Sequence, residues 1–371
     1  MLTKFEVTNF KNFNEKISLD FTKSNMYTFN TECVVDGIIN KALIYGHNGI
    51  GKSNLGFAIF DIVSHSTDKT ASKNSYKNYL NAYNKSSIAS FKYEFRLKSG
   101  KISYEYGKSD IETLIYEKII INDKLYASLD RRNNSIATFN AEGTENLQKD
   151  IGESKISIIS YIIKNSVLKE NKDNKCFTEF NDFINGMLFF RSLEHNDYIG
   201  FEQGSKGIAE DIIEKNNVTD FQNFLNEAGI ECTLDIIDDG NTQKLAFNFD
   251  NKLIPFFDIA SQGTKSLSLF YYWFQRLRDN SSKVIFLFID EFDAFYHHSL
   301  SALIVKKLCL IRAQVIITTH NTSIMTNELL RPDCYFLMNK KGIHSLSGST
   351  VKELREAHNI EKMYKAGVFG V

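Results

Sequence analysis

A glycine-rich loop lies between an apolar run and a helix-like segment, and its residues suit phosphate chemistry. The run Leu43–Tyr45 ends at Gly46, and the loop leads to Lys52 and Ser53. This is the pattern G-x-x-x-x-G-K-S, in which glycines let successive backbone N–H groups turn toward phosphate oxygens. We predict a nucleoside triphosphate site in which Lys52 bridges the β- and γ-phosphates and Ser53 binds Mg²⁺; a ligand-free turn is the alternative. The predicted nucleotide-binding residues of the loop are Gly46, His47, Asn48, Gly49, Ile50, Gly51, Lys52, Ser53 and Asn54.

Two adjacent acids follow a second apolar run. Val284–Ile289 is continuously apolar, which is typical of a parallel strand buried on both faces, and Asp290 and Glu291 come directly after it. Ligands of open α/β sheets bind at the carboxyl ends of such strands. We expect Asp290 to hold Mg²⁺, directly or through water, and Glu291 to orient and deprotonate the attacking water. The alternative is a pair of strand-end acids that cap the next turn.

His320 ends a third apolar run, Gln314–Thr319, about one strand–helix–strand step after the two acids. An imidazole at this position could hydrogen-bond the γ-phosphate and the lytic water, so we include His320 among the catalytic residues with Lys52 and Glu291. His297 and His298 follow Asp293 closely, but no third ligand has suitable spacing, so a structural or dimer-interface role is favoured over a metal site.

The surrounding pattern predicts an α/β fold with a mainly parallel core sheet. Residues 2–21 alternate as a hairpin, and residues 91–106 form a second one, which predicts an antiparallel accessory sheet. Residues 54–66 have helical spacing, and residues 67–90 are polar and predict a mobile surface segment. We divide the chain into a first ATPase part over 1–150, an inserted helical lobe over 151–230, and a second ATPase part over 231–371.

Composition limits the class of protein. The 371 residues are 43% hydrophobic with a net charge of -1, so charge alone does not argue for nucleic acid. The five cysteines are scattered, which predicts reduced thiols rather than disulfides. No signal-peptide core or membrane-length apolar run is evident, so we expect a cytoplasmic protein without a membrane partner.

The order of these motifs resembles the ABC-type ATPase fold of the SMC, RecF and OLD proteins. The resemblance includes the phosphate loop, a strand with Asp290-Glu291 and a strand with Thr319-His320. It implies ATP and Mg²⁺ as cofactors and a homodimer or higher oligomer that holds ATP between two heads. It also assigns further residues: a signature segment that acts on the opposite subunit, a loop residue that crosses the dimer interface, and an N-terminal turn near the nucleotide. These are Ser261, Gln262, Gly263 and Thr264 for the signature, Asp293 for the crossing loop, and Lys11 and Asn12 for the turn.

More closely, the chain resembles the AbiLi/RloA-like ATPases of abortive-infection and phage-defence loci. The shared features are Asp290–Asp293 with His297, the segment Arg331–Asp333, and a tail over Asn359–Gly370. This resemblance implies a slow or partner-regulated ATPase switch that controls an effector encoded nearby, such as a nuclease or toxin or an RloB-like protein. No glutamine occurs between Phe91 and Tyr106, where the family's magnesium-sensing glutamine is expected.

A RecF-like clamp that grips DNA under ATP control is the competing function, and nucleic acid as a partner is left open. An OLD-type nuclease would need an appended acidic domain, and only about fifty residues follow His320. A tether of the SMC type would need a coiled coil, and no sustained heptads occur. Composition does not exclude a membrane transporter subunit, but the signature segment departs from that class.

Overall fold

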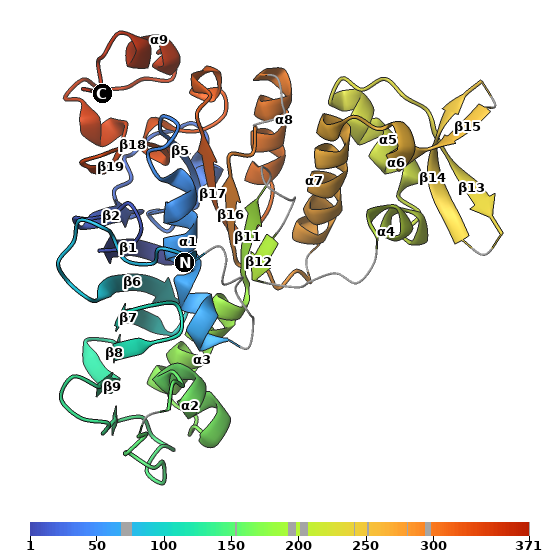
Figure 1. Cartoon of the computed structure of the whole chain (residues 1–371). Helices are drawn as coiled ribbons and strands as arrows, with labels where there is room; N and C mark the ends of the chain where they lie inside the picture. Colours follow the sequence, from blue (N-terminus) through green and yellow to red (C-terminus); the bar gives the residue numbers. More distant parts are fainter. Residues whose placement is uncertain are drawn as a thin grey trace.

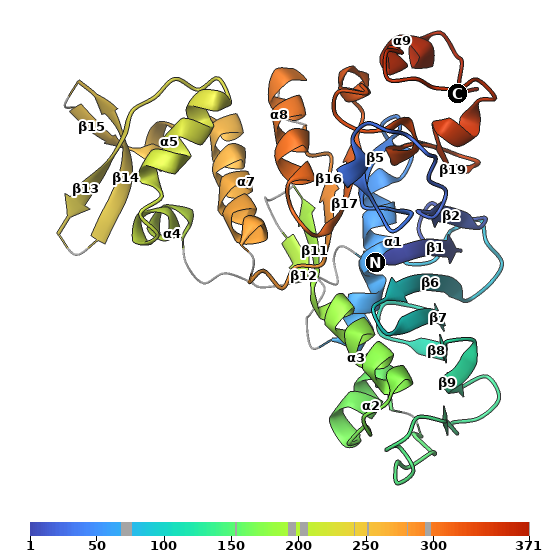
Figure 2. The same cartoon turned by 180° about the vertical axis from the view of Figure 1, so that it is seen from behind.

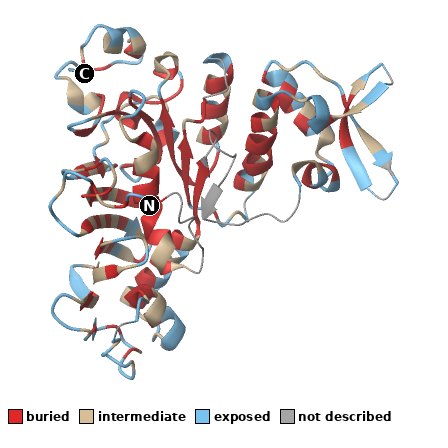
Figure 3. Ribbon diagram, in the orientation of Figure 1, coloured by how far each residue is buried: buried red, intermediate tan, exposed pale blue. Residues whose placement is uncertain are grey.

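The computed structural model describes residues 1–67, 76–152, 154–191, 198–200, 207–240, 242–250, 252–279, 281–293 and 298–370. Strands and helices alternate in a mixed α/β arrangement, so the predicted fold class is confirmed at that level (Figure 1). In these residues two seven-stranded sheets pack side by side, and a smaller unit with three strands projects from them. Buried residues concentrate on the strands of one large sheet and on the helices beside it (Figure 3).

The core sheet is mainly parallel and has the strand order β12-β11-β16-β17-β5-β18-β19. Its two edge strands, β12 and β19, pair antiparallel with their neighbours, and the other pairings are parallel. The three central strands are buried along their whole length because both faces of the sheet are covered. The strands are β5 (Lys41–Tyr45), β11 (Met187–Arg191), β12 (Tyr198–Gly200), β16 (Phe286–Asp290), β17 (Gln314–Thr319), β18 (Tyr335–Asn339) and β19 (Gly342–Ser345).

Two helices connect and cover the central strands. Helix α1 (Lys52–Ser66) follows β5 and contacts β11 and β16, and α8 (His298–Cys309) connects β16 to β17. The chain after β17 forms the 3₁₀ turn η3 (Thr322–Ile324), and α9 (Ile360–Lys365) lies against it. Tyr364 of α9 packs on Tyr45 at the end of β5, with ring centroids 5.0 Å apart.

The second large sheet is antiparallel, with the order β10-β9-β8-β7-β6-β1-β2. Helices α2 (Ile158–Asn165) and α3 (Lys172–Asn185) contact this sheet and also α1. A short ladder, β3 (Val34–Val35) and β4 (Ile38–Ile39), precedes β5. The strands of the sheet are β1 (Leu2–Thr8), β2 (Ile17–Asp20), β6 (Ala89–Leu97), β7 (Gly100–Lys108), β8 (Leu114–Ile121), β9 (Lys124–Asp130) and β10 (Thr138–Phe139).

An outlying unit stands on the far side of α8 from the core strands (Figures 1 and 2). Its three-stranded sheet packs on short helices, and its longest helix, α7, lies nearest to α8. Lys307 of α8 forms an ion pair with Glu227 of this unit at 2.6 Å. The elements are α4 (Ile208–Glu214), α5 (Val218–Glu227), β13 (Leu234–Asp239), β14 (Thr242–Phe249), β15 (Lys252–Pro255), α6 (Phe256–Ile259) and α7 (Gln262–Arg278).

The division into 1–150, 151–230 and 231–371 stays a prediction, and the described elements group in a different way. Helices α2 and α3 belong to the antiparallel sheet, β11 joins the core sheet, and 207–279 form the outlying unit. Helix α3 ends at Asn185, and the apolar residues that follow it up to Phe190 belong to β11. Helical spacing cannot separate a helix from the buried strand that follows it when both are apolar.

The predicted mobile surface segment over 67–90 is also corrected in part. Residues 68–75 lie outside the described residues. Tyr76 and Tyr79 are buried, and their hydroxyls donate to the Phe57 carbonyl at 3.2 Å and to Asp61 Oδ1 at 2.9 Å. The polar composition of the segment gave no sign that these two tyrosines are buried and contact α1. In the part of the chain that the structure describes, no helix has the length and apolarity needed to cross a membrane.

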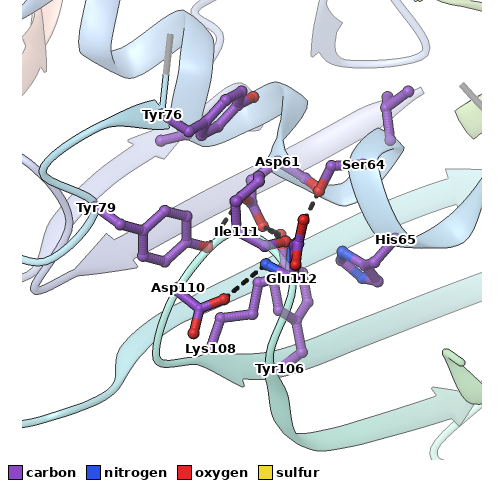
Figure 4. Close-up of polar contacts among 12 residues, drawn as sticks. Asp61, Ser64, His65, Tyr76, Tyr79, Tyr106, Lys108, Asp110, Ile111 and Glu112 are labelled. Carbon is purple, nitrogen blue, oxygen red and sulfur yellow. Dashed lines mark hydrogen bonds and ion pairs between the residues drawn. The ribbon is translucent and has the colours of Figure 1, made fainter. Parts of the chain in front are cut away.

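A buried ion pair joins α1 to the antiparallel sheet (Figure 4). Lys108 Nζ of β7 lies 3.0 Å from Asp61 Oδ2 of α1, and both side chains have 0% exposure. Asp61 also accepts hydrogen bonds from the hydroxyls of Tyr79 and Tyr106, each at 2.9 Å. Burial lowers the pKa of Lys108, while the nearby Asp61 carboxylate acts to raise it. The pair therefore fixes the rotation and position of α1, the helix that begins at the phosphate loop.

Lys108→Met should destabilise the fold strongly because it leaves the Asp61 carboxylate buried without a cation. Loss of one partner of a buried pair costs about 3–5 kcal/mol in the free energy of unfolding. Chemical denaturation monitored by circular dichroism would measure it. Lys101→Met, at an exposed position of the same strand, is the matched control and should change stability little. Equal effects of the two substitutions would contradict the role assigned to this pair.

Candidate active site

The phosphate loop has the backbone shape that its glycines allow. Gly49 and Gly51 have φ values of 77° and 107°, in the left-handed region that residues with a Cβ avoid. At Gly46 a Cβ would lie 2.9 Å from the Ile50 side chain and 3.1 Å from the Met338 carbonyl oxygen. The Leu55 N–H then donates to the Gly51 carbonyl at 2.9 Å, so the helix begins directly after the loop. The loop N–H groups and the helix N-terminus thus lie at one end of β5, an arrangement that suits an anion.

The N-terminal turn contacts this loop through Asn12. Its Nδ2 donates to the Ile50 carbonyl at 2.9 Å, and its Oδ1 accepts from Asn54 Nδ2 at 2.7 Å. A Cβ on Gly51 would lie 2.2 Å from Asn12 Nδ2, so it would displace the Asn12 side chain from the loop. Lys11 has a different place: its Nζ donates to the Lys77 carbonyl at 3.2 Å and lies 5.5 Å from the centre of the Phe57 ring. Asn12 is therefore a predicted turn residue that contacts the loop.

Lys52 folds back over the loop and reaches the acids at the end of β16. Its side chain is 2% exposed, and Nζ donates to the carbonyls of Gly46 at 2.9 Å and His47 at 3.3 Å. Nζ also lies 3.2 Å from Glu291 Oε1. The predicted phosphate-binding cation and the predicted general base are thus an ion pair in this structure.

Asp290 and Glu291 are held by the neighbouring strand β17. Asp290 is 4% exposed, and its Oδ1 accepts a hydrogen bond from Thr318 Oγ1 at 2.7 Å. The Glu291 N–H donates to the same Thr318 oxygen at 2.8 Å. Glu291 has a φ of 41°, an unusual left-handed conformation for a residue with a side chain. This bend redirects the chain at the end of β16, where the Glu291 carboxylate meets Lys52.

Asp293 lies beside the end of β17 rather than on the surface. Its side chain is buried, Oδ2 accepts from Thr319 Oγ1 at 2.7 Å, and Oδ1 has no hydrogen-bond partner within the described ranges. Burial raises the pKa of the Asp293 carboxyl, and the Thr319 hydroxyl and the nearby His320 act in the opposite direction. His320 itself is exposed at the end of the strand. His297 lies outside the described residues, and His298 Nδ1 is 2.7 Å from Ser323 Oγ.

The signature segment is placed away from this cluster. Ser261 is the N-cap of α7: its Oγ accepts from the Thr264 N–H at 3.1 Å. Ser261 and Gln262 are exposed, so the start of this 17-residue helix faces outward on the outlying unit. A hollow of about 850 Å³ adjoins Ser261 and Thr264. The structure therefore does not bring Ser261–Thr264 together with Lys52 and Glu291 of the same chain.

The residues present fit a Mg²⁺ ion carried by a nucleotide. Ser53 offers a hydroxyl oxygen at the start of α1, and Asp290 offers a carboxylate oxygen, which are the hard ligands that Mg²⁺ prefers. Mg²⁺ takes few protein ligands and is completed by phosphates and water, so two oxygens suffice. In the described part of the chain no group of three His, Cys, Asp or Glu side chains could hold a metal by itself.

The sequence pattern assigned no separate role to Thr318 or Thr319, whose hydroxyls contact Asp290 and Asp293. Both threonines are fully buried. Thr318 donates a hydrogen bond to Asp290, the last residue of β16, and Thr319 donates one to Asp293. Two threonines immediately before His320 were visible in the sequence, but only the strand pairing shows which acids they face.

Comparison with known proteins gives one family. Residues 41–326, most of the chain, match the model of the family described as "AAA domain, putative AbiEii toxin, Type IV TA system". No curated protein matches the chain. Among solved structures, the SMC head bound to the C-winged helix domain of ScpA is similar at 14% identity and a TM-score of 0.45, over 92% of this chain and 95% of that chain. The SMC head domain from Thermotoga maritima is similar at 14% identity and a TM-score of 0.41, over 93% of this chain and 98% of that chain.

Asn12→Ala should weaken nucleotide binding because it removes both hydrogen bonds between the N-terminal turn and the loop. One such bond contributes roughly 0.5–1.5 kcal/mol, so we expect about a tenfold loss of affinity for a fluorescent ATP analogue, measured by equilibrium titration. Glu15→Ala, at an exposed position of the same turn, is the control. An Asn12→Ala variant with unchanged affinity would show that the turn does not support the loop.

Proposed function

The chain belongs to this AAA-domain family, and we propose that it binds and hydrolyses ATP as an ABC-type ATPase. The observation that carries the proposal is the contact between Lys52 and Glu291, because it joins the phosphate loop to the acids at the end of β16. These residues come from distant parts of the sequence and meet beyond the carboxyl ends of β5 and β16, the two strands that flank β17. Nucleotides bind at this edge in open sheets.

The roles of the residues follow from their chemistry. Loop N–H groups and Lys52 would bind the phosphates, and Ser53 and Asp290 would hold Mg²⁺, which neutralises charge on the phosphates when bound. Glu291 would orient a water molecule and take its proton as the water attacks the γ-phosphate. His320, exposed at the end of β17, would hydrogen-bond the γ-phosphate. Lys52 has to exchange contacts with Gly46, His47 and Glu291 for phosphate oxygens, so nucleotide binding would release the Glu291 carboxylate toward water.

A second copy of the chain would complete the site. The exposed start of α7, with Ser261 and Gly263, offers N–H groups and a helix N-terminus that suit a γ-phosphate. Because this segment lies on the outlying unit, we propose that it acts on the nucleotide of a partner subunit in a homodimer or higher oligomer. At that interface the Asp293 carboxylate would gain a hydrogen bond. Its buried Oδ1 lacks a hydrogen-bond partner among the residues described here, so a donor from the partner subunit would satisfy it.

We further propose that hydrolysis drives a switch in a cytoplasmic bacterial anti-phage system of the abortive-infection type. The family description names a toxin of a toxin–antitoxin system, and the motifs of the chain resemble AbiLi/RloA-like ATPases. Both favour a role in which the ATP state controls an effector, such as a nuclease or toxin or an RloB-like protein.

A DNA-binding clamp is the second candidate, and one hollow in the structure favours it. A cavity of about 320 Å³ between β2 and β19 is lined by four lysines and one histidine. Asp20 is the acidic side chain in its lining, and it accepts hydrogen bonds from Thr22. A phosphodiester backbone suits such a surface, and its binding would weaken steeply with salt. The lining lysines and histidine are Lys4, Lys16, Lys23, Lys341 and His344.

Glu291→Gln should slow ATP hydrolysis by several orders of magnitude and increase ATP retention. The amide cannot act as a base, and its loss of charge weakens the contact that competes with phosphate for Lys52. Phosphate release and analogue titration would measure the two effects, and light scattering with and without ATP would show whether the variant dimerises. Lys52→Ala is the matched control and should lose nucleotide binding. Normal turnover in Lys52→Ala would refute the site, while a Glu291→Gln mass that ignores ATP would refute head closure.

Affinity purification of Glu291→Gln from the native host, with Lys52→Ala as control, tests the switch. Mass spectrometry should identify a nuclease- or toxin-like protein, encoded nearby, that is retained only by the ATP-trapped form. Salt-sensitive recovery of nucleic acid without a protein partner would overturn the switch and favour the clamp. A Lys341→Glu variant of the Glu291→Gln protein would then lose the nucleic acid.

A further inference from the structure

We propose that Thr318 is a positioning residue of the hydrolytic site, through which β17 sets both Asp290 and Glu291. The inference rests on the proposed ATPase function and adds to it a residue that acts through Asp290 and Glu291. Its hydroxyl makes two hydrogen bonds at once, one to the carboxylate that would hold Mg²⁺ and one to the backbone of the general base.

The donor and acceptor roles of this hydroxyl are fixed by its partners. Asp290 Oδ1, 2.7 Å away, can only accept, so the Thr318 proton points to it. The Glu291 N–H, 2.8 Å away, can only donate, so it uses a lone pair of the same oxygen. Thr318 is fully buried, so water does not compete for either bond. A buried hydroxyl with both roles in use holds the rotation of Asp290 and the bend at Glu291 together.

The bend at Glu291 needs such support. A φ of 41° is unfavourable for a residue with a Cβ, because the left-handed region crowds Cβ against the backbone. The Thr318 oxygen contacts the N–H of Glu291, while Lys52 Nζ contacts its carboxylate at 3.2 Å. When Lys52 turns to phosphate oxygens, Glu291 would lose its contact with Lys52. Its backbone hydrogen bond to Thr318 would remain. Thr318 would therefore keep Glu291 aimed at the site after nucleotide has bound.

The adjacent residue, Thr319, provides a matched comparison inside the same strand. It is equally buried, and its hydroxyl also makes two bonds: it donates to Asp293 Oδ2 at 2.7 Å and accepts from the Asn321 N–H at 2.9 Å. The chemistry of the two threonines is the same, but the acids differ. Thr318 forms its hydrogen bonds with Asp290 and Glu291, whereas Thr319 donates to Asp293.

Thr318→Val tests the proposal, because valine keeps the shape of threonine and removes its hydroxyl. Removal of a hydrogen-bond partner of a metal-binding carboxylate typically costs 10–100-fold in metal affinity or activity, and we expect a loss of about this size. Mn²⁺ replaces Mg²⁺ as the probe: its affinity for the full-length chain with a non-hydrolysable ATP analogue is measured by electron paramagnetic resonance. kcat is measured with Mg²⁺ and ATP. Affinity for the analogue in EDTA should be unchanged, since the phosphate loop is intact.

Controls separate positioning from damage to the strand. Thr319→Val should leave the Mn²⁺ affinity at the wild-type value, and Thr318→Ser should restore it. If Thr318→Val does not fold, as judged by its thermal unfolding, Thr318→Ser and Thr318→Ala form a second pair that differs only in the hydroxyl. Ala should then show the loss and Ser should not.

The outcomes distinguish this inference from the proposed function. Wild-type Mn²⁺ affinity and kcat in Thr318→Val would overturn the inference while leaving the ATPase in place. Equal Mn²⁺ losses in Thr318→Val and Thr319→Val would also overturn it, because they would show a general effect of the strand. A wild-type chain that binds no analogue and hydrolyses no ATP would instead refute the proposed function itself.

Discussion

The parallel pairing of β17 with β5 on one side and β16 on the other is the constraint on which the candidate site depends. The register places Ile317 opposite both Ile289 and Leu43, and Thr319 opposite Tyr45. Polar residues that follow the three strands therefore emerge at the same edge of the sheet. A slip of one residue would turn the side chains of buried strands to the opposite face, so the apolar packing that stabilises the sheet also fixes the register. The positions of Lys52, Asp290 and Thr318 are a consequence of that packing.

The position of the phosphate loop depends on helix α1, which is packed against the core sheet. Gly56 lets the helix lie directly on the core strands, since a Cβ there would lie 2.7 Å from the Phe189 ring and 2.8 Å from the Phe288 ring. Farther along the helix, Asp61 binds Lys108 of the antiparallel sheet. Close apolar contact on one side and a buried ion pair on the other leave α1 little freedom to slide or rotate. Its first residue, Lys52, is thereby held at a set distance from the end of β16.

The parts of the candidate site that could be predicted from the sequence are those that depend on short local patterns of residues. The loop before Lys52, the acids after a buried strand and His320 after another required only apolar periodicity and residue type. The Lys52–Glu291 contact and the threonine bonds could not be predicted in the same way, because they depend on which strands are neighbours. The strand β11 was missed for a related reason: its apolar residues continue the pattern of α3, and only the sheet distinguishes them.

If the proposed roles hold, the ion pair between Lys52 and Glu291 would link nucleotide binding to readiness for hydrolysis. Lys52 is 2% exposed, and an unpaired charge at that depth is costly, so the lysine needs an anion at all times. Glu291 and a phosphate group could each supply that anion, so the two would compete for contact with the Lys52 ammonium. Such coupling is reciprocal: an event that draws Glu291 away favours phosphate binding, and phosphate binding frees Glu291. Because Glu291 is anchored through its backbone to β17, freeing its carboxylate changes the direction of a side chain and leaves the sheet unaltered. A base at Glu291 would therefore become available through a local rotation, without a rearrangement of the fold.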